Sequence, residues 1–213
     1  MSYGNGIFVA VGAYGILTTS SDGAVWERND DGFSESDYVN LNGVTFGNGT
    51  FVVVGDNGVL LTSSNGTSWD SRDSGTSVKL KGVTFGNGTF VAVGDIDSYT
   101  YYAAVVTSQD GGASWSGDAS YVSYSLNDVA FGNGNFMVVG DMGNIYTSPD
   151  ASYWLVKSDP DVTSSYLIGV THANNTFVAV GYDMSSDDAV QGLILTSSDG
   201  TSWTSRTSET STV

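Results

Sequence analysis

Acidic and aromatic side chains gather in a few segments of this 213-residue chain, where they could bind a ligand or a metal ion. Tyrosine offers a flat apolar ring with a polar tip, and carboxylates accept hydrogen bonds, so such segments suit contact with a sugar or a protein. The candidate ligand-binding residues are Asp95, Asp97, Tyr99, Tyr101, Tyr102, Asp183, Asp187, Asp188, Gln191 and Tyr38.

The same segments make calcium the one metal ion that the sequence favours. Asp183, Asp187 and Asp188, or alternatively Asp95 and Asp97, could supply the oxygen ligands that calcium prefers. Neither segment has the ligand spacing of an EF-hand loop. The chain has no cysteine and a single histidine, which disfavours the usual zinc sites. We therefore expect no cofactor and leave calcium open.

Catalytic constellations are hard to find in this sequence. Most glycosidases need two carboxyl groups about 5–10 Å apart, and Asp128 is the only acid near the strands expected to be innermost. His172 stands where other repeats carry a phenylalanine, so we expect it to pack rather than to catalyse. The sequence thus predicts a non-enzymatic binding or structural module, with a glycoside hydrolase as the alternative.

The charge balance narrows the class of partner. Six lysines and arginines stand against 23 aspartates and glutamates, for a net charge of −17. Such a chain repels nucleic-acid phosphates and anionic lipid headgroups. It also has no apolar run of the roughly 18–20 residues that a membrane-spanning helix requires. We therefore expect a protein or glycan partner, no nucleic-acid binding and no membrane insertion.

An internal repeat of about 40 residues organises the whole chain, a period that is typical of β-propellers. Two independent markers recur five times in the same register. The first is an apolar FVAVG-like run beginning at Phe8, Phe51, Phe90, Phe136 and Phe177. The second is a tryptophan that follows each run, at Trp26, Trp69, Trp115, Trp154 and Trp203.

Each repeat has the pattern of four short antiparallel strands. Asn-Gly pairs such as Asn48-Gly49 favour tight hairpin turns, because both residues accept a positive φ. The second run, Phe51 to Val54, is apolar without alternation, which is typical of a strand covered on both faces. The sequence therefore predicts a single all-β domain, a five-bladed β-propeller of four-stranded antiparallel blades. The approximate blade limits are residues 1–40, 41–79, 80–125, 126–166 and 167–213.

The segment before each tryptophan resembles an Asp box, the turn that characterises bacterial-neuraminidase-repeat propellers. The five copies read TSSDGAVW, TSSNGTSW, TSQDGGASW, TSPDASYW and TSSDGTSW. In each box a short polar side chain can accept backbone N–H bonds of the turn, so we expect a structural role. These residues are Asp22, Asn65, Asp110, Asp150 and Asp199. The fourth box has Ala151 where glycine is usual, which predicts an altered turn.

The pattern is also similar to photosystem II stability/assembly factor proteins and to Asp-box repeat proteins of bacteria and tailed phages. That resemblance implies an assembly factor as a further alternative, and a virion-associated or extracellular setting. It does not extend to sialidase activity. The three arginines, Arg28, Arg72 and Arg206, follow box tryptophans on expected outer strands and do not form a substrate-binding cluster.

Loop lengths point to one face of the propeller as the contact surface. The loop between the second and third strands is longer in the third and fifth repeats, and the connection to the next repeat also varies. In a meander blade both connections emerge on the same side, and insertions gathered on one side often mark a binding face. We further expect a closed ring with the termini within roughly 15 Å, the reach of about four extended residues.

Overall fold

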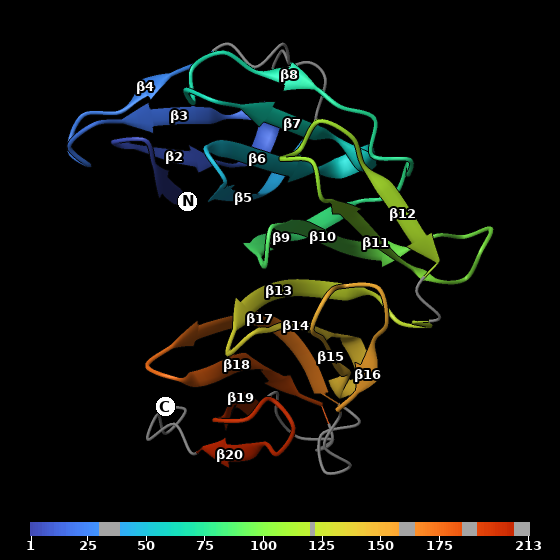
Figure 1. Ribbon diagram of the computed structural model, residues 1–213. Helices are drawn as coiled ribbons and strands as arrows, with labels where there is room; N and C mark the ends of the chain where they lie inside the picture. The colour runs from blue at the N-terminus through green and yellow to red at the C-terminus, as the bar shows by residue number, and fades with distance from the viewer. Residues whose placement is uncertain (30–38, 120–121, 158–164, 185–190, 207–213) are drawn as a thin grey trace.

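The computed structural model describes residues 1–29, 39–119, 122–157, 165–184 and 191–206. The described strands form five antiparallel sheets of four strands, and within each sheet the strands follow chain order. The structure is thus the five-bladed β-propeller that the repeat predicts (Figure 1). In the described residues no helix is long and apolar enough to cross a membrane.

The first three blades run from the N-terminus to residue 119. Blade 1 contains β1 (Ser2–Gly4), β2 (Ile7–Val11), β3 (Leu17–Ser20) and β4 (Glu27–Arg28). Blade 2 contains β5 (Leu41–Gly47), β6 (Thr50–Gly55), β7 (Leu60–Ser63) and β8 (Asp70–Ser71). Blade 3 contains β9 (Leu80–Gly86), β10 (Thr89–Ile96), β11 (Ala103–Ser108) and β12 (Ser116–Ala119).

The last two blades complete the array. Blade 4 contains β13 (Leu126–Gly132), β14 (Asn135–Gly140), β15 (Ile145–Ser148) and β16 (Leu155–Val156). Blade 5 contains β17 (Ser165–Ala173), β18 (Thr176–Asp183), β19 (Gln191–Ser197) and β20 (Thr204–Arg206). In blades 1, 2 and 4 a short 3₁₀ turn links the second and third strands, at Ala13–Gly15, Asp56–Gly58 and Asp141–Gly143.

Tight hairpins between the first two strands set the register of every blade. In blade 2, Asn48 and Gly49 have φ angles of 47° and 78°, values that asparagine and glycine tolerate best. The turn places Phe46 opposite Phe51 across the β5–β6 pair. Their rings lie 4.6 Å apart, and the Phe51 ring lies 6.4 Å from Trp69 of the box. The ring at the end of the first strand contacts the marker phenylalanine in all five blades. The contact of that phenylalanine with the box tryptophan recurs in blades 1 and 3.

The second strand of each interior blade is buried on both faces. In β6, Phe51 and Val53 pack into a cluster with Val9 of blade 1, whereas Val52 and Val54 pack with Phe90 of blade 3. All four side chains of this run are fully buried. The prediction of a strand covered on both sides is confirmed. We call the face of a blade toward the preceding blade its leading face, and the opposite face its trailing face.

In blades 1 to 4 a glycine at the end of the first strand lets the next blade approach closely. A Cβ at Gly47 would overlap the ring of Phe85 in blade 3, and Gly4, Gly86 and Gly132 meet aromatic rings in the same way. The ring against Gly132 is that of His172, which also packs on Phe177 with 4.6 Å between centroids. His172 therefore has the packing position expected of it.

The described residues do not repeat this interface between blade 5 and blade 1, and the expectation of a closed ring is not met there. Val54, Val93 and Val139 are fully buried, but their counterpart in blade 5, Val180, is 40% exposed. Ala173 stands where the other four blades have the glycine, so its Cβ occupies the space that the next aromatic ring needs. Figure 1 accordingly shows blades 1 and 5 at the two ends of an arc. The C-terminal residue, Val213, lies outside the described residues, so the predicted distance between the termini stays a prediction.

Candidate functional site

The loops between the second and third strands meet the connections between blades, as the pattern of loop lengths predicts. The backbone N–H of Asp56 donates to the carbonyl oxygen of Asn40 at 2.9 Å. The equivalent bond in blade 3 joins Asp95 to Lys79, also at 2.9 Å. These bonds tie the two kinds of loop together on one side of the propeller, which we call the loop face.

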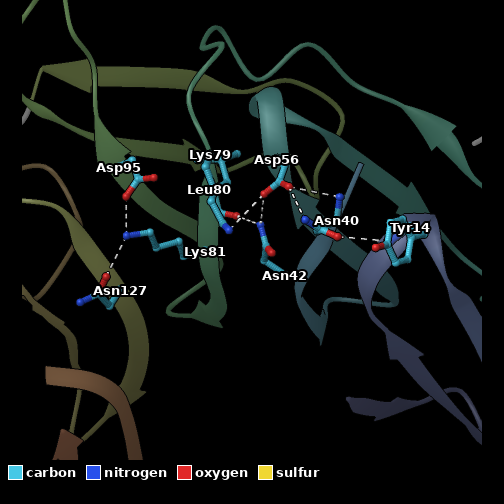
Figure 2. Close-up of polar contacts among 9 residues, drawn as sticks. All are labelled: Tyr14, Asn40, Asn42, Asp56, Lys79, Leu80, Lys81, Asp95 and Asn127. Carbon is cyan, nitrogen blue, oxygen red and sulfur yellow. Dashed lines mark hydrogen bonds and ion pairs between the residues drawn. The ribbon is translucent and has the colours of Figure 1, made fainter. Parts of the chain in front are cut away.

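Polar side chains on the loop face connect one blade to the next (Figure 2). The amide nitrogen of Asn42 donates to Asp56 of its own blade at 3.0 Å and to the carbonyl oxygen of Leu80 in blade 3 at 2.8 Å. Two blades further on, Asn127 makes the same pair of bonds, to Asp141 and to the carbonyl oxygen of Leu167. The repeat thus builds a polar bridge beside the innermost strands.

Blade 3 makes this bridge with a cation. Lys81 replaces the asparagine, forms an ion pair with Asp95, and donates to Asn127 of blade 4 at 2.9 Å. Lys79 pairs with Asp56 at 3.3 Å. Partial burial alone would raise the pKa of Asp56, but hydrogen bonds from Asn42 and Asn40 and the nearby Lys79 outweigh it and lower the pKa.

Sequence reasoning missed this bridge although its signal is present. An aspartate follows the glycine of the FVAVG-like run in blades 2, 3 and 4 but not in blades 1 and 5. Asparagine or lysine follows the first leucine of the innermost strand in the same three blades. In the sequence, the loop aspartate and the strand asparagine or lysine lie about 14 residues apart and give no sign that they interact. Only the fold brings the two side chains into contact.

Within the part of the loop face that the structure describes, the loop of blade 3 carries the two most exposed aromatic side chains. The Asp97 carboxylate accepts the backbone N–H groups of Tyr99 and Thr100 at 2.8 and 2.9 Å, which lowers its pKa. Its backbone exchanges hydrogen bonds with Tyr101 and Tyr102 at 2.8 and 2.9 Å. The resulting turn leaves Tyr99 90% exposed and Tyr101 74% exposed.

A pocket of about 220 Å³ lies beside this turn. One wall is formed by Asp97, Thr100 and Tyr102 of blade 3, and another by Gly75 and Thr76, which follow the outer strand of blade 2. The remaining lining is the β-strand segment 103–106 together with Gly117. The pocket therefore combines an apolar lining with hydroxyl and carboxylate groups, a composition suited to a side chain of a partner.

The other candidate residues do not join this pocket. Asp95 turns toward Lys81 and takes part in the inter-blade bridge. Asp183 and Gln191 lie opposite each other in the β18–β19 pair, in a different blade. Tyr38, Asp187 and Asp188 lie outside the described residues. Within the described residues no group of three or more histidine, aspartate or glutamate side chains could hold a metal ion.

The five Asp boxes use their polar side chains within the turn. In the first box the Asp22 carboxylate accepts the N–H groups of Ala24 and Val25 at 2.8 and 3.0 Å, while the Trp26 indole donates to the Gly23 carbonyl oxygen at 3.1 Å. Hydrogen bonds from the turn lower the pKa of Asp22. Ala151 of the fourth box has a φ of 64°, so it keeps the turn in a conformation that favours glycine.

Asp128 is the one acid in the described first strands, and its surroundings differ from those of the box residues. Its two carboxylate oxygens accept the backbone N–H groups of Val129 and, across the blade interface, Val170, at 2.8 and 2.9 Å. Burial raises the pKa of Asp128 despite these two bonds. A single carboxyl group occupied by backbone donors does not form the pair that glycoside hydrolysis requires.

Solved structures similar to this chain are β-propellers. YCF48 bound to a D1 peptide has a TM-score of 0.66 and 17% identity, and the match covers 95% of this chain and 66% of that one. YCF48 from Cyanidioschyzon merolae has a TM-score of 0.58 and 18% identity, over 79% of this chain and 57% of that one. An ancestral GH74 enzyme has a TM-score of 0.66 and 16% identity, over 94% of this chain and 29% of that one.

These matches place the chain in the class of β-propellers and support the resemblance to photosystem II assembly factors. At such identities they show the fold alone. The chain spans less than two thirds of the length of each of these structures. No family model and no curated protein matches the sequence.

Proposed function

We propose that the chain is a non-enzymatic binding module whose loop face takes a protein partner at the loop of blade 3. The observation that carries this proposal is the Asp97 turn, which presents Tyr99 and Tyr101 to solvent beside a pocket of about 220 Å³. Because the turn is already hydrogen-bonded, less conformational entropy is lost when a partner binds. Exposed tyrosines on a rigid support are typical anchors of protein interfaces.

The chemistry of the pocket favours a side chain of an extended peptide. In its strand-segment lining, residues 103–106, Ala103, Val105 and Val106 are buried and Ala104 is partly exposed, and Thr100 and Tyr102 add hydroxyl groups. YCF48, a propeller of the same fold, has been solved with a D1 peptide, which supports a peptide as the kind of partner.

The alternative of a glycoside hydrolase draws support from the GH74 match. We place it second because both carboxylate oxygens of Asp128, and Oδ1 of Asp97, accept backbone N–H groups. A virion-associated or extracellular setting, and a glycan ligand, stay predictions of the sequence and its resemblance.

Peptide selection followed by a matched pair of variants tests the proposal. A displayed random-peptide library is selected on the immobilised protein, and an enriched peptide is measured by fluorescence anisotropy against each variant. The double substitution Tyr99→Ala and Tyr101→Ala should weaken binding by roughly tenfold or more, since hot-spot tyrosines carry much of an interface. Tyr153→Ala is the matched control, because Tyr153 is 70% exposed but belongs to a box turn away from the loop face.

Equal binding by the double variant and the control would place the partner elsewhere. Failure to enrich any peptide, together with reducing-sugar release from a polysaccharide panel that Asp128→Asn abolishes, would instead establish the hydrolase.

A further inference from the structure

The pocket beside the blade 3 loop has one charged side chain among the described residues that line it. That side chain is Asp97, and the other lining residues are glycines, alanines, valines, threonines and a tyrosine. The volume of about 220 Å³ is smaller than the roughly 300–1,000 Å³ of sites that hold drug-sized ligands. The pocket is therefore of a size for a single side chain, and its one charge is negative.

The turn uses only part of the Asp97 carboxylate. Both backbone N–H bonds, from Tyr99 and Thr100, end on Oδ1, so Oδ2 carries neither of them. Hydrogen bonds from the backbone of Thr100 and Tyr99 lower the pKa of Asp97, which keeps the carboxylate ionised at neutral pH. Because an ionised carboxylate has about four acceptor positions, Asp97 can bind a further donor at the pocket.

The chain does not supply a cation to this carboxylate. Blades 2 and 3, residues 39–119, contain three lysines and arginines, and each forms an ion pair with a different acid (Figure 2 shows the two lysines). The pairs are Lys79–Asp56, Lys81–Asp95 and Arg72–Asp70. The net charge of −17 further attracts a positively charged partner to the protein.

The strand that lines the pocket is held rigidly between two blades. On the leading face of β11, Val106 packs with Val52 of blade 2, and on its trailing face Val105 packs with Phe136 of blade 4. The lining therefore needs little rearrangement when a side chain enters, so binding loses less conformational entropy.

The uncharged lining suits a long, thin side chain. Gly75 and Gly117 have no side chain, and Ala104 contributes a partly exposed methyl group. Lysine and arginine pack their methylene stems along such surface and keep the charged group at a polar end. An apolar side chain would instead take water from the Asp97 carboxylate without giving it a counter-charge, which costs free energy.

Resting on the proposed function, we propose that this pocket takes a lysine or arginine side chain of the partner peptide. The stem lies along the small residues between blades 2 and 3, and the ammonium or guanidinium group donates to Oδ2 of Asp97. Tyr99 and Tyr101 contact neighbouring residues of the same peptide. Asp97 then has two roles, because Oδ1 holds the turn that presents the tyrosines and Oδ2 selects a basic partner.

The substitution Asp97→Asn separates these two roles. Asn65 of the second box shows that an amide oxygen can hold a turn of this kind, since it accepts the N–H groups of Thr67 and Ser68 at 3.0 and 2.9 Å. The variant should therefore keep the turn and lose the negative charge. Asp22→Asn is the matched control, because it makes the same change in a similar turn of a box away from the loop face.

Peptide selection and a charge-neutral analogue test the proposal. Peptides selected from a displayed random library on the wild-type protein should share a lysine or arginine at one position. One such peptide and its analogue with methionine at that position are then measured by fluorescence anisotropy. The wild type and Asp22→Asn should prefer the basic peptide by roughly tenfold or more, because its charge-assisted hydrogen bond is absent from the analogue.

Asp97→Asn should bind the two peptides almost equally, and it should bind the methionine analogue as well as the wild type does. Added salt should reduce the preference of the wild type for the basic peptide, since the charges are partly exposed to solvent.

The outcomes distinguish this inference from the function on which it rests. Selected peptides without a shared basic residue, whose binding still depends on Tyr99 and Tyr101, would overturn the inference and leave the proposed function intact. An undiminished preference for the basic peptide in Asp97→Asn would also overturn it. So would equal weakening of both peptides by Asp97→Asn, which would assign Asp97 to the turn alone. Failure to enrich any peptide would overturn the inference and the proposed function together.

Discussion

The interior interfaces and the end faces of this propeller are built from the same repeat but differ in burial. Phe51, Phe90, Phe136 and Phe177 are at most 1% exposed, whereas Phe8 at the free end is only partly buried. In four blades a glycine lets an aromatic side chain of the next blade pack against the backbone, and in blade 5 this position is Ala173. The difference shows that each blade needs its neighbour to bury its apolar side chains. The contribution of a residue to the free energy of unfolding therefore depends on which blade it belongs to as well as on its type.

Removing the phenylalanine that recurs in every repeat should have the largest effect, and the loss of stability should be larger in an interior blade than in blade 1. Phe51→Ala leaves a cavity between two blades and should lower the free energy of unfolding by about 3–5 kcal/mol. Phe8→Ala removes a ring that already contacts water, so we expect about 1–2 kcal/mol. Urea denaturation followed by tryptophan fluorescence measures both. Equal losses would show that blade 1 is covered in solution.

Adding a methyl group where blades meet should have the next largest effect. Gly86→Ala places a Cβ in the ring of Phe131 and should cost about 1–3 kcal/mol through overpacking. Ala173→Gly is the reverse change at the free end. There it relieves no contact within the chain and should cost about 0.5–1 kcal/mol, the usual penalty for glycine inside a strand. A stabilising Ala173→Gly in a protein that remains monomeric would mean that the ring closes on itself.

Substitutions at the polar bridge should show a smaller difference in stability between an interior blade and blade 5. Asn42→Ala deletes the hydrogen bonds to Asp56 and to the Leu80 carbonyl oxygen and should cost about 1–2 kcal/mol. Ile168 occupies the same repeat position on blade 5, where no next blade is packed. Ile168→Asn should therefore change stability by less than about 0.5 kcal/mol. Thermal unfolding of both variants checks this, and a large loss for Ile168→Asn would show that this side chain is buried against a partner.

The blades were predictable because their signal is local. Five aromatic markers in register and Asn-Gly hairpins such as Asn48-Gly49 specify strands within single repeats. The two-sided burial of β6 follows from its unbroken apolar run. The open junction was missed because it concerns residues of the first and last blades, such as Tyr3 and Ala173, whose relative position no single repeat encodes.

The candidate site was predictable only in part. The loop face could be predicted because the loops that vary in length between repeats all emerge there. The Asp97 turn is an Asx turn, which depends on neighbouring residues alone. The pocket beside it was not foreseen, because Gly75 and Thr76 come from the preceding blade. Asp95 was predicted to bind a ligand together with Asp97 because the two residues are close in sequence. In the structure Asp95 instead forms an ion pair with Lys81 and belongs to the inter-blade bridge. Side-chain direction at a blade boundary is set by the neighbouring blade, which a single repeat does not encode.

The smallest predicted effect concerns how the interior interface responds to pH. Burial at the boundary of blades 4 and 5 raises the pKa of Asp128, so the folded protein holds this proton more tightly than the unfolded chain does. Its contribution to stability is greatest below the unfolded pKa, near about 4, and is lost as the pH rises through the folded pKa. As the pH rises from about 4 to 7, the wild type should therefore lose stability relative to the Asp128→Asn variant.

Asp56 serves as the internal control of opposite sign. Its pKa is lowered in the folded state, so its contribution is present above the unfolded pKa and is lost as the pH falls through the folded pKa. The difference between wild type and Asp56→Asn should thus shrink toward acidic pH. Urea titrations at a series of pH values measure both slopes. Parallel slopes for the two variants would show that Asp128 is hydrated, and that the boundary between blades 4 and 5 is as open to water as the free ends of the arc.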